Sequence, residues 1–124
     1  MKGISELFQG ILNKGKVEKF DIREGTIEFW VKENKIIWND NKETVLLNAP
    51  VNNVGSLFMI KDDDNKLKFF HVILGKGRTD VEIDVSNLAL DKPHHIAVTW
   101  SLKEKKVVHY VDGGELKDEK SIKY

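Results

Sequence analysis

Two carboxylates at alternate positions are the arrangement in this sequence that comes nearest to catalytic chemistry. Glu82 and Asp84 lie in the segment VEIDVSN, where a strand would point both side chains to one face. A pair of carboxyl groups can hydrolyse a glycosidic bond, but the two groups must then flank that bond. Neighbours on one strand do not provide this placement. We therefore expect an ordinary half-exposed strand, no catalytic residues and no enzymatic activity.

Metal-binding side chains are present, but their spacing is unfavourable. The segment KDDDNK, residues 61–66, offers several oxygen ligands but lacks the Gly and the distal Glu of an EF-hand loop. Its composition favours a hairpin turn. His94 and His95 would point to opposite faces of a strand, so they cannot easily share a zinc ion. The sequence contains no cysteine, which excludes disulfides and thiolate sites. We expect neither a metal nor another cofactor.

Aromatic rings beside short polar side chains offer a better functional lead. Trp38 adjoins Asn39 and Asp40 at a predicted turn, and Tyr110 shares a strand face with Asp112. A flat ring packs on the C–H groups of a sugar, while amide and carboxylate groups bind its hydroxyls. The alternative is that these rings fill the core. These five residues are the predicted ligand-binding residues.

Trp30 departs from the alternation around it. The segment GTIEFWVK would place Ile27, Phe29 and Val31 on one strand face and Trp30 on the other, beside Glu28. Trp is highly buried on average, so burial in a second core layer is favoured over an exposed ring.

Short alternating segments separated by turn residues run from residue 17 onward. KIIW and ETVLL flank Asn-Asp-Asn and predict a hairpin, and SLFMI and KLKFFHVIL flank KDDDN and predict a second. The middle segment turns through GKGR into DVEIDV, and HIAVTWSL turns through KEKK into VVHYVD. About nine or ten strands with this spacing predict an all-β antiparallel sandwich or barrel.

The N-terminal stretch ISELFQGIL has a different period. Its apolar residues fall at helical spacing, which predicts a helical segment over residues 1–15 before a β domain over 16–124. The stripe consists of Ile4, Leu7, Phe8, Ile11 and Leu12. We expect this stripe to pack on its own domain. Docking or homo-oligomer formation through residues 4–12 or an edge strand is the alternative.

Composition limits the classes of partner. The 124 residues are 40% hydrophobic and 32% charged, which suits one globular domain. Basic and acidic residues number 20 each, and Arg occurs only at Arg23 and Arg78, so neither nucleic acid nor a membrane is expected as partner. There is no signal peptide or transmembrane stretch, which favours a cytoplasmic or virion-associated protein unless the domain was excised from a larger secreted one.

The stretch HHIAVTWSLKEKKVVHYVDGGEL, residues 94–116, resembles the signature hairpin of concanavalin A-like, laminin G-like jelly-roll domains. GTIEFWVK resembles an early strand of that family, and KLKFFHVILGKGRTDVEIDV resembles its middle hairpin. The resemblance implies a jelly roll of two packed antiparallel sheets. It also implies non-catalytic binding of a carbohydrate or a protein surface, in some members with calcium. Viral and phage structural proteins carry similar domains.

Two departures from the family pattern affect the functional prediction. Related glycoside hydrolases use Glu-Ile-Asp-x-x-Glu, whereas Ser86 and Asn87 stand here where the third carboxylate would fall. No calcium cluster of the family is recognisable. We therefore predict a binding module for carbohydrate or a protein surface. A structural component of a virion or assembly is the second hypothesis, and a glucanase-like hydrolase is the third.

Overall fold

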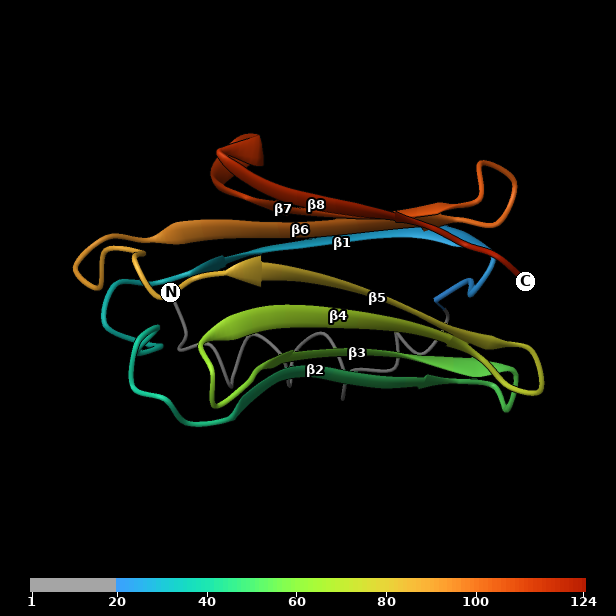
Figure 1. Cartoon of the computed structure of the whole chain (residues 1–124), viewed down its shortest axis with the longest axis horizontal. Coiled ribbons are helices and arrows are strands. Elements are labelled where there is room, and N and C mark those ends of the chain that lie inside the picture. Colours follow the sequence, from blue (N-terminus) through green and yellow to red (C-terminus); the bar gives the residue numbers. More distant parts are fainter. Residues whose placement is uncertain (1–19) are drawn as a thin grey trace.

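The structure, a computed structural model, describes residues 20–124, which form a sandwich of two antiparallel sheets (Figure 1). Each sheet contains four strands. The strands are β1 (Glu24–Val31), β2 (Thr44–Val51), β3 (Gly55–Lys61), β4 (Lys66–Ile73), β5 (Gly77–Asp84), β6 (His94–Ser101), β7 (Lys106–Val111) and β8 (Leu116–Ser121). The predicted helical segment of residues 1–15, with its apolar stripe at 4–12, lies outside the described residues.

The strand order confirms the antiparallel sandwich. One sheet has the order β1-β6-β7-β8, and the other has the order β2-β3-β4-β5. The chain passes from the first sheet to the second through residues 32–43 and returns through residues 85–93 (Figure 1). The remaining connections join neighbouring antiparallel strands. Both crossovers and the β3–β4 turn lie at the same end of the sandwich, so segments far apart in sequence meet there.

Three predicted hairpins are confirmed, and one is wrong. The turns between β3 and β4, β4 and β5, and β6 and β7 fall where the sequence places them. The segment KIIW is not a strand, because it belongs to the crossover between the sheets and β2 begins only at Thr44. Ile36 and Trp38 are buried and Ile37 is exposed, which gives this loop the alternation of a strand. Residues 20–124 contain eight strands, fewer than the nine or ten expected.

The core lies between the sheets and follows the period-two pattern of the strands. Ile96, Val98 and Trp100 of β6 are buried, as predicted. The indole Nε1 of Trp100 donates to the carbonyl of Asp21 at 2.8 Å, which satisfies the polar atom of this large ring. The Phe69 ring of the opposite sheet stacks on Trp100 with 6.0 Å between centroids. Trp100 therefore links the two sheets within the core, near the end of β6.

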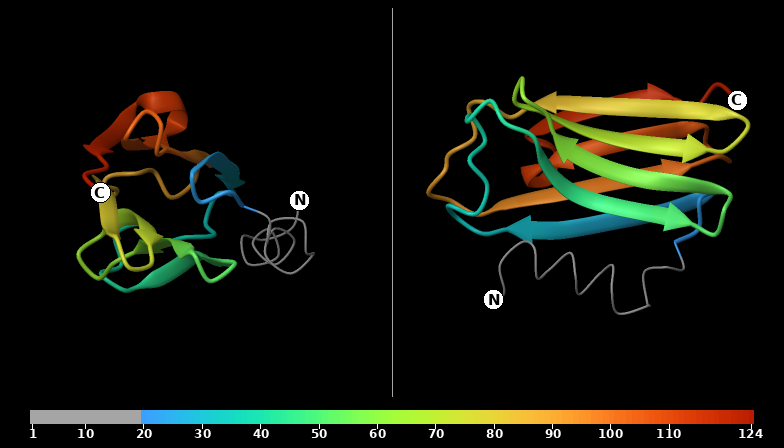
Figure 2. Two further views of the ribbon diagram at one scale, coloured as in Figure 1. Left: turned by 90° about the vertical axis from the view of Figure 1, so that its right-hand side faces the viewer. Right: turned by 90° about the horizontal axis from the view of Figure 1, so that it is seen from below.

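The two sides of the sandwich differ. On one side the edge strands β5 and β8 adjoin, and the backbone N–H of Glu82 donates to Asp118 at 2.8 Å. The C-terminal residues lie on this side (Figure 2). On the other side the edge strands are β1 and β2, and β2 carries Pro50 and a register shift between Val45 and Leu47. Such irregularities hinder pairing with a further strand. Within residues 20–124, no helix is long and apolar enough to cross a membrane.

Candidate functional site

The outer face of the β1-β6-β7-β8 sheet presents an exposed tryptophan. Because side chains alternate along β1, Phe29 and Val31 enter the core and Trp30 points away from it. The Trp30 side chain is 52% exposed, whereas Trp38 and Trp100 are each 2% exposed. The preferred interpretation of Trp30, burial in a second core layer, is therefore wrong, since no described element covers this part of the sheet.

His95 supports the Trp30 ring from the neighbouring strand. The two residues are directly paired between β1 and β6, and their rings lie 5.1 Å apart with a tilt of 58°. The Nε2 of His95 donates to Glu28 Oε1 at 3.0 Å. These contacts restrain the ring without covering it. A carboxylate and an imidazole thus stand beside an exposed aromatic face.

The same face continues across the sheet. Glu28 is paired with Ala97, which is paired in turn with Tyr110 of β7. The ammonium group of Lys117 lies 5.8 Å from the Tyr110 ring centroid. The small Ala97 therefore separates Glu28 from Tyr110, and Trp30 lies one outward position further along β1. We call this surface the Trp30 face, which comprises Glu28, Trp30, His95, Ala97 and Tyr110.

Asp112 fixes the backbone beneath His95. Its Oδ1 accepts a hydrogen bond from the His95 backbone N–H at 2.9 Å. Its Oδ2 lies 2.7 Å from His94 Nδ1, and His94 Nε2 lies 2.7 Å from the carbonyl oxygen of Ala89. Asp112 adopts a positive φ of 54°, a conformation that Asp tolerates better than most residues. The Asp-Gly turn therefore positions the start of β6 and, through it, the support of Trp30.

The five residues predicted to bind a ligand do not form one site. Trp38 is buried and meets the His94 ring edge to face at 5.9 Å, so its ring belongs to the core. Asn39 is exposed in the crossover loop. Asp40 is engaged by a lysine described below. Tyr110 lies on the Trp30 face, and Asp112 supports that face from beneath.

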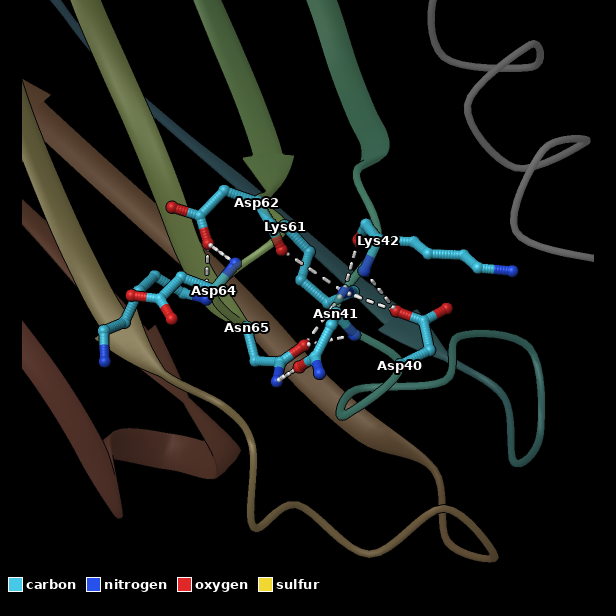
Figure 3. A network of polar contacts seen from close by, with 8 residues as sticks. Asp40, Asn41, Lys42, Lys61, Asp62, Asp64 and Asn65 are labelled. Carbon is cyan, nitrogen blue, oxygen red and sulfur yellow. Dashed lines mark hydrogen bonds and ion pairs between the residues drawn. The ribbon is translucent and has the colours of Figure 1, made fainter.

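A buried lysine anchors the crossover loop (Figure 3). The side chain of Lys61 is fully buried, and its ammonium group donates to Asp40 Oδ1 at 2.8 Å and to the carbonyl of Lys42. Asn65 Oδ1 lies 3.4 Å from the same nitrogen and accepts the backbone N–H of Asn41. The hydrogen bond from Lys61 lowers the pKa of Asp40. This cluster holds the crossover against the β3–β4 turn, a structural role that the sequence did not suggest.

The acidic segment between β3 and β4 forms the predicted turn. Asp62 Oδ1 accepts the backbone N–H groups of Asp64 and Lys66 at 2.9 Å, as in an Asx turn. Its other oxygen pairs with Lys68 at 2.9 Å. Among residues 20–124, no group of three His, Cys, Asp or Glu side chains is placed to hold a metal ion.

The carboxylates of β5 have basic neighbours. Glu82 is paired with Lys68, and Asp84 with Lys66. Asp84 accepts hydrogen bonds from the hydroxyl and backbone N–H of Ser86, which lower its pKa to about 2. A carboxyl group this acidic is a poor proton donor near neutral pH. Asp84 is therefore poorly suited to act as a general acid, and its contacts with Ser86 hold the chain at the end of β5.

Two histidines in the core are held neutral. His109 lies between the sheets with both ring nitrogens unpaired within the described part of the chain, and burial lowers its pKa to about 4. His71 donates from Nε2 to the carbonyl of Ile22 at 2.7 Å, and burial lowers its pKa as well. Neither imidazole reaches the Trp30 face, so we expect the protonation of these histidines to affect the stability of the fold.

Comparison of this chain with protein-family models, with curated proteins and with solved structures finds no match. The functional argument therefore depends on the geometry of the chain itself.

The sequence contained one signal for the Trp30 face. Trp30 shares its strand face with Thr26, Glu28 and Lys32, which are polar residues. A bulky ring on a polar face is informative when no second layer covers that face. The support from His95 could not be inferred, because it depends on the register between strands that lie far apart in sequence.

Proposed function

We propose that this protein is a non-catalytic module that binds carbohydrate through the Trp30 face. The observation that carries the proposal is the half-exposed Trp30 ring, held by His95 and flanked by Glu28. An indole face packs against the C–H groups of a pyranose ring. Carboxylate and imidazole groups beside it can bind the sugar hydroxyls.

The geometry of the face suits an extended glycan. Trp30 and Tyr110 lie on strands separated by β6, on which His95 is paired with Trp30 and Ala97 with Tyr110. Because β1 is an edge strand, a glycan chain can reach Trp30 without displacing other described elements. We expect contacts with several sugar units and a weak affinity for each one.

A glycan array tests this proposal. Wild-type protein should retain one class of oligosaccharide, and Trp30→Ala should lose that signal while its melting temperature stays close to that of the wild type. Leu74→Ala is the matched control, because Leu74 is 59% exposed and lies in the β4–β5 turn, away from β1 and β6. Equal retention of glycans by the wild type and Trp30→Ala would refute the proposal.

The finer fold assignment is part of the same proposal. We place the sandwich among concanavalin A-like jelly-roll domains, on the resemblance carried by residues 94–116. The contact between His94 and Asp112 supports it, because it gives two residues of the resembling hairpin a shared structural role.

A structural role in an assembly is the second candidate. The outer face of the other sheet carries a stacked pair, Phe58 and Phe70, with 5.8 Å between centroids. Arg78 covers Phe70 at 4.8 Å, and Val45 nearby is 54% exposed. Apolar groups in such a patch suit a protein contact. A stable oligomer in solution that Phe58→Ser dissociates, together with no glycan binding, would favour this role.

A further inference from the structure

A cavity of about 460 Å³, wide open to solvent, is lined by residues of β5, of β8 and of the C-terminal segment. The C-terminal residues lie on the side where β5 and β8 adjoin (Figure 2). The cavity lining includes Arg78 and Asp80 of β5 and Ser121 of β8, together with Lys123 and Tyr124. This volume falls within the range of small-molecule sites. The cavity lies at the opposite edge of the sheet from β1, so it is separate from the Trp30 face.

Tyr124 is built into this cavity. Gly77 allows the ring to lie on β5, because a Cβ at that position would stand 2.8 Å from Tyr124 Cδ1. The Tyr124 hydroxyl accepts from Thr79 Oγ1 at 3.0 Å and donates to the carbonyl of His71 at 3.2 Å. The side chain nevertheless remains 37% exposed. The ring is therefore fixed at its hydroxyl end and along β5 while part of it faces the cavity.

The polar lining carries charges of both signs, and Glu119 and Lys123 belong to it as well. Arg78 pairs with Asp80 at 2.8 Å, and Lys120 pairs at 3.0 Å with Asp118, which lies outside the lining. Paired groups place donors and acceptors side by side, an arrangement that suits adjacent hydroxyls better than a free ion. The Tyr124 ring suits the C–H face of a pyranose, and the paired charges and the Ser121 hydroxyl suit its hydroxyl groups.

We propose that this cavity is a second binding site, which takes a single neutral sugar unit against Tyr124. The ligand class rests on the proposed function, but the site does not use the Trp30 face. One chain would thus contact a glycan, or two glycans, at two remote positions. Tyr124 supplies the stacking surface, and Arg78, Asp80 and Ser121 supply hydrogen bonds to the hydroxyls.

Amide NMR titration of the full chain tests both sites separately. The probes are the methyl glycosides of glucose, galactose and mannose. At least one should shift the amides of Thr79, Asp80 and Ser121 saturably, in the wild type and equally in Trp30→Ala. The absence of saturable shifts at these amides with all three probes would overturn the inference. Shifts at Glu28 and His95 report on the Trp30 face alone, so failure of the proposed function is seen independently.

Two variants identify the stacking surface. Tyr124→Leu should weaken binding about tenfold, while Tyr124→Phe should retain most of it, because only the first loses the flat ring. Ser121→Trp fills the cavity, leaves Tyr124 and its partners in place and should abolish binding even if Tyr124→Leu proves unstable. Unchanged affinity in Tyr124→Leu or in Ser121→Trp would contradict the inference.

Discussion

The ammonium group of the fully buried Lys61 lies 2.8 Å from Oδ1 of the partly exposed Asp40, at one end of the sandwich. This pair connects the crossover between the sheets to the last residue of β3. Further oxygens from Lys42 and Asn65 complete the surroundings of the cation. A buried ammonium is tolerated because it is fully hydrogen-bonded.

Replacing this lysine should loosen the crossover. Lys61→Met keeps most of the side-chain volume but leaves buried acceptors without a donor, so we expect the free energy of unfolding to fall by about 2 kcal/mol. Urea denaturation measures the change. Lys42→Met is the control, since its side chain is exposed and the hydrogen bonds of Lys42 in this cluster come from its backbone carbonyl and N–H. Equal stability of both variants would show that the Lys61 contacts do not anchor the loop.

Chelation should have no effect on stability. Both carboxylate oxygens of Asp62 in the β3–β4 turn are engaged, by backbone N–H groups and by Lys68, and the Asp40 carboxylate of the crossover is engaged by Lys61. We therefore expect the same melting temperature with and without EDTA. A fall in melting temperature that calcium reverses would mean that a cation site exists.

His109 should make the protein sensitive to acid. Its pKa is about 4 in the folded protein and near 6.5 when unfolded, so the unfolded state binds the proton first as the pH falls. Stability should therefore decrease between pH 6.5 and 4. The contribution of His109 is about 3 kcal/mol, since one pKa unit corresponds to about 1.4 kcal/mol. Urea denaturation across this pH range measures it.

His109→Leu provides the matching control. The variant removes the titrating group, so its stability should fall less steeply than that of the wild type between pH 6.5 and 4. Some dependence should persist, because burial lowers the pKa of His71 in the same direction. Identical slopes for the variant and the wild type would exclude His109 as the source.

Trp100 should be a sensitive position of the core. Trp100→Ala removes the ring that contacts Phe69 and leaves a cavity, which should lower the free energy of unfolding by about 3–5 kcal/mol. Gly25→Ala should also destabilise, because the new Cβ would stand 2.6 Å from Trp100 Cζ2. Denaturant titration tests both variants. An unchanged denaturation midpoint for Trp100→Ala would contradict the assignment of β6 to the core.

Local patterns in the sequence were sufficient for most of the sheet structure. The hairpin of residues 94–111 follows from alternation and from its charged turn, and the structure confirms it. The strand predicted for KIIW is wrong, because a crossover loop in which Ile36 and Trp38 are buried and Ile37 is exposed has the same alternation as a paired strand. Hydrogen-bond partners, which distinguish the two, depend on tertiary arrangement.

The candidate site was harder to predict for a related reason. Alternation assigns Trp30 and Trp38 to faces, but it does not say which face another layer covers. Lys61 follows Leu57 and Met59 at alternate positions of β3, and all three residues are buried. Its partner Asp40 lies 21 residues away, so no local pattern reveals the pair.

Collisional quenching of tryptophan fluorescence tests the binding proposal most directly. Trp30 is 52% exposed and the other two tryptophans are 2% exposed, so acrylamide should quench mainly Trp30. A saturating amount of a glycan retained on the array should protect this emission, and Trp30→Phe should lose the protectable fraction. A glycan that binds while the quenching of Trp30 remains unchanged would contradict the assignment of the Trp30 face.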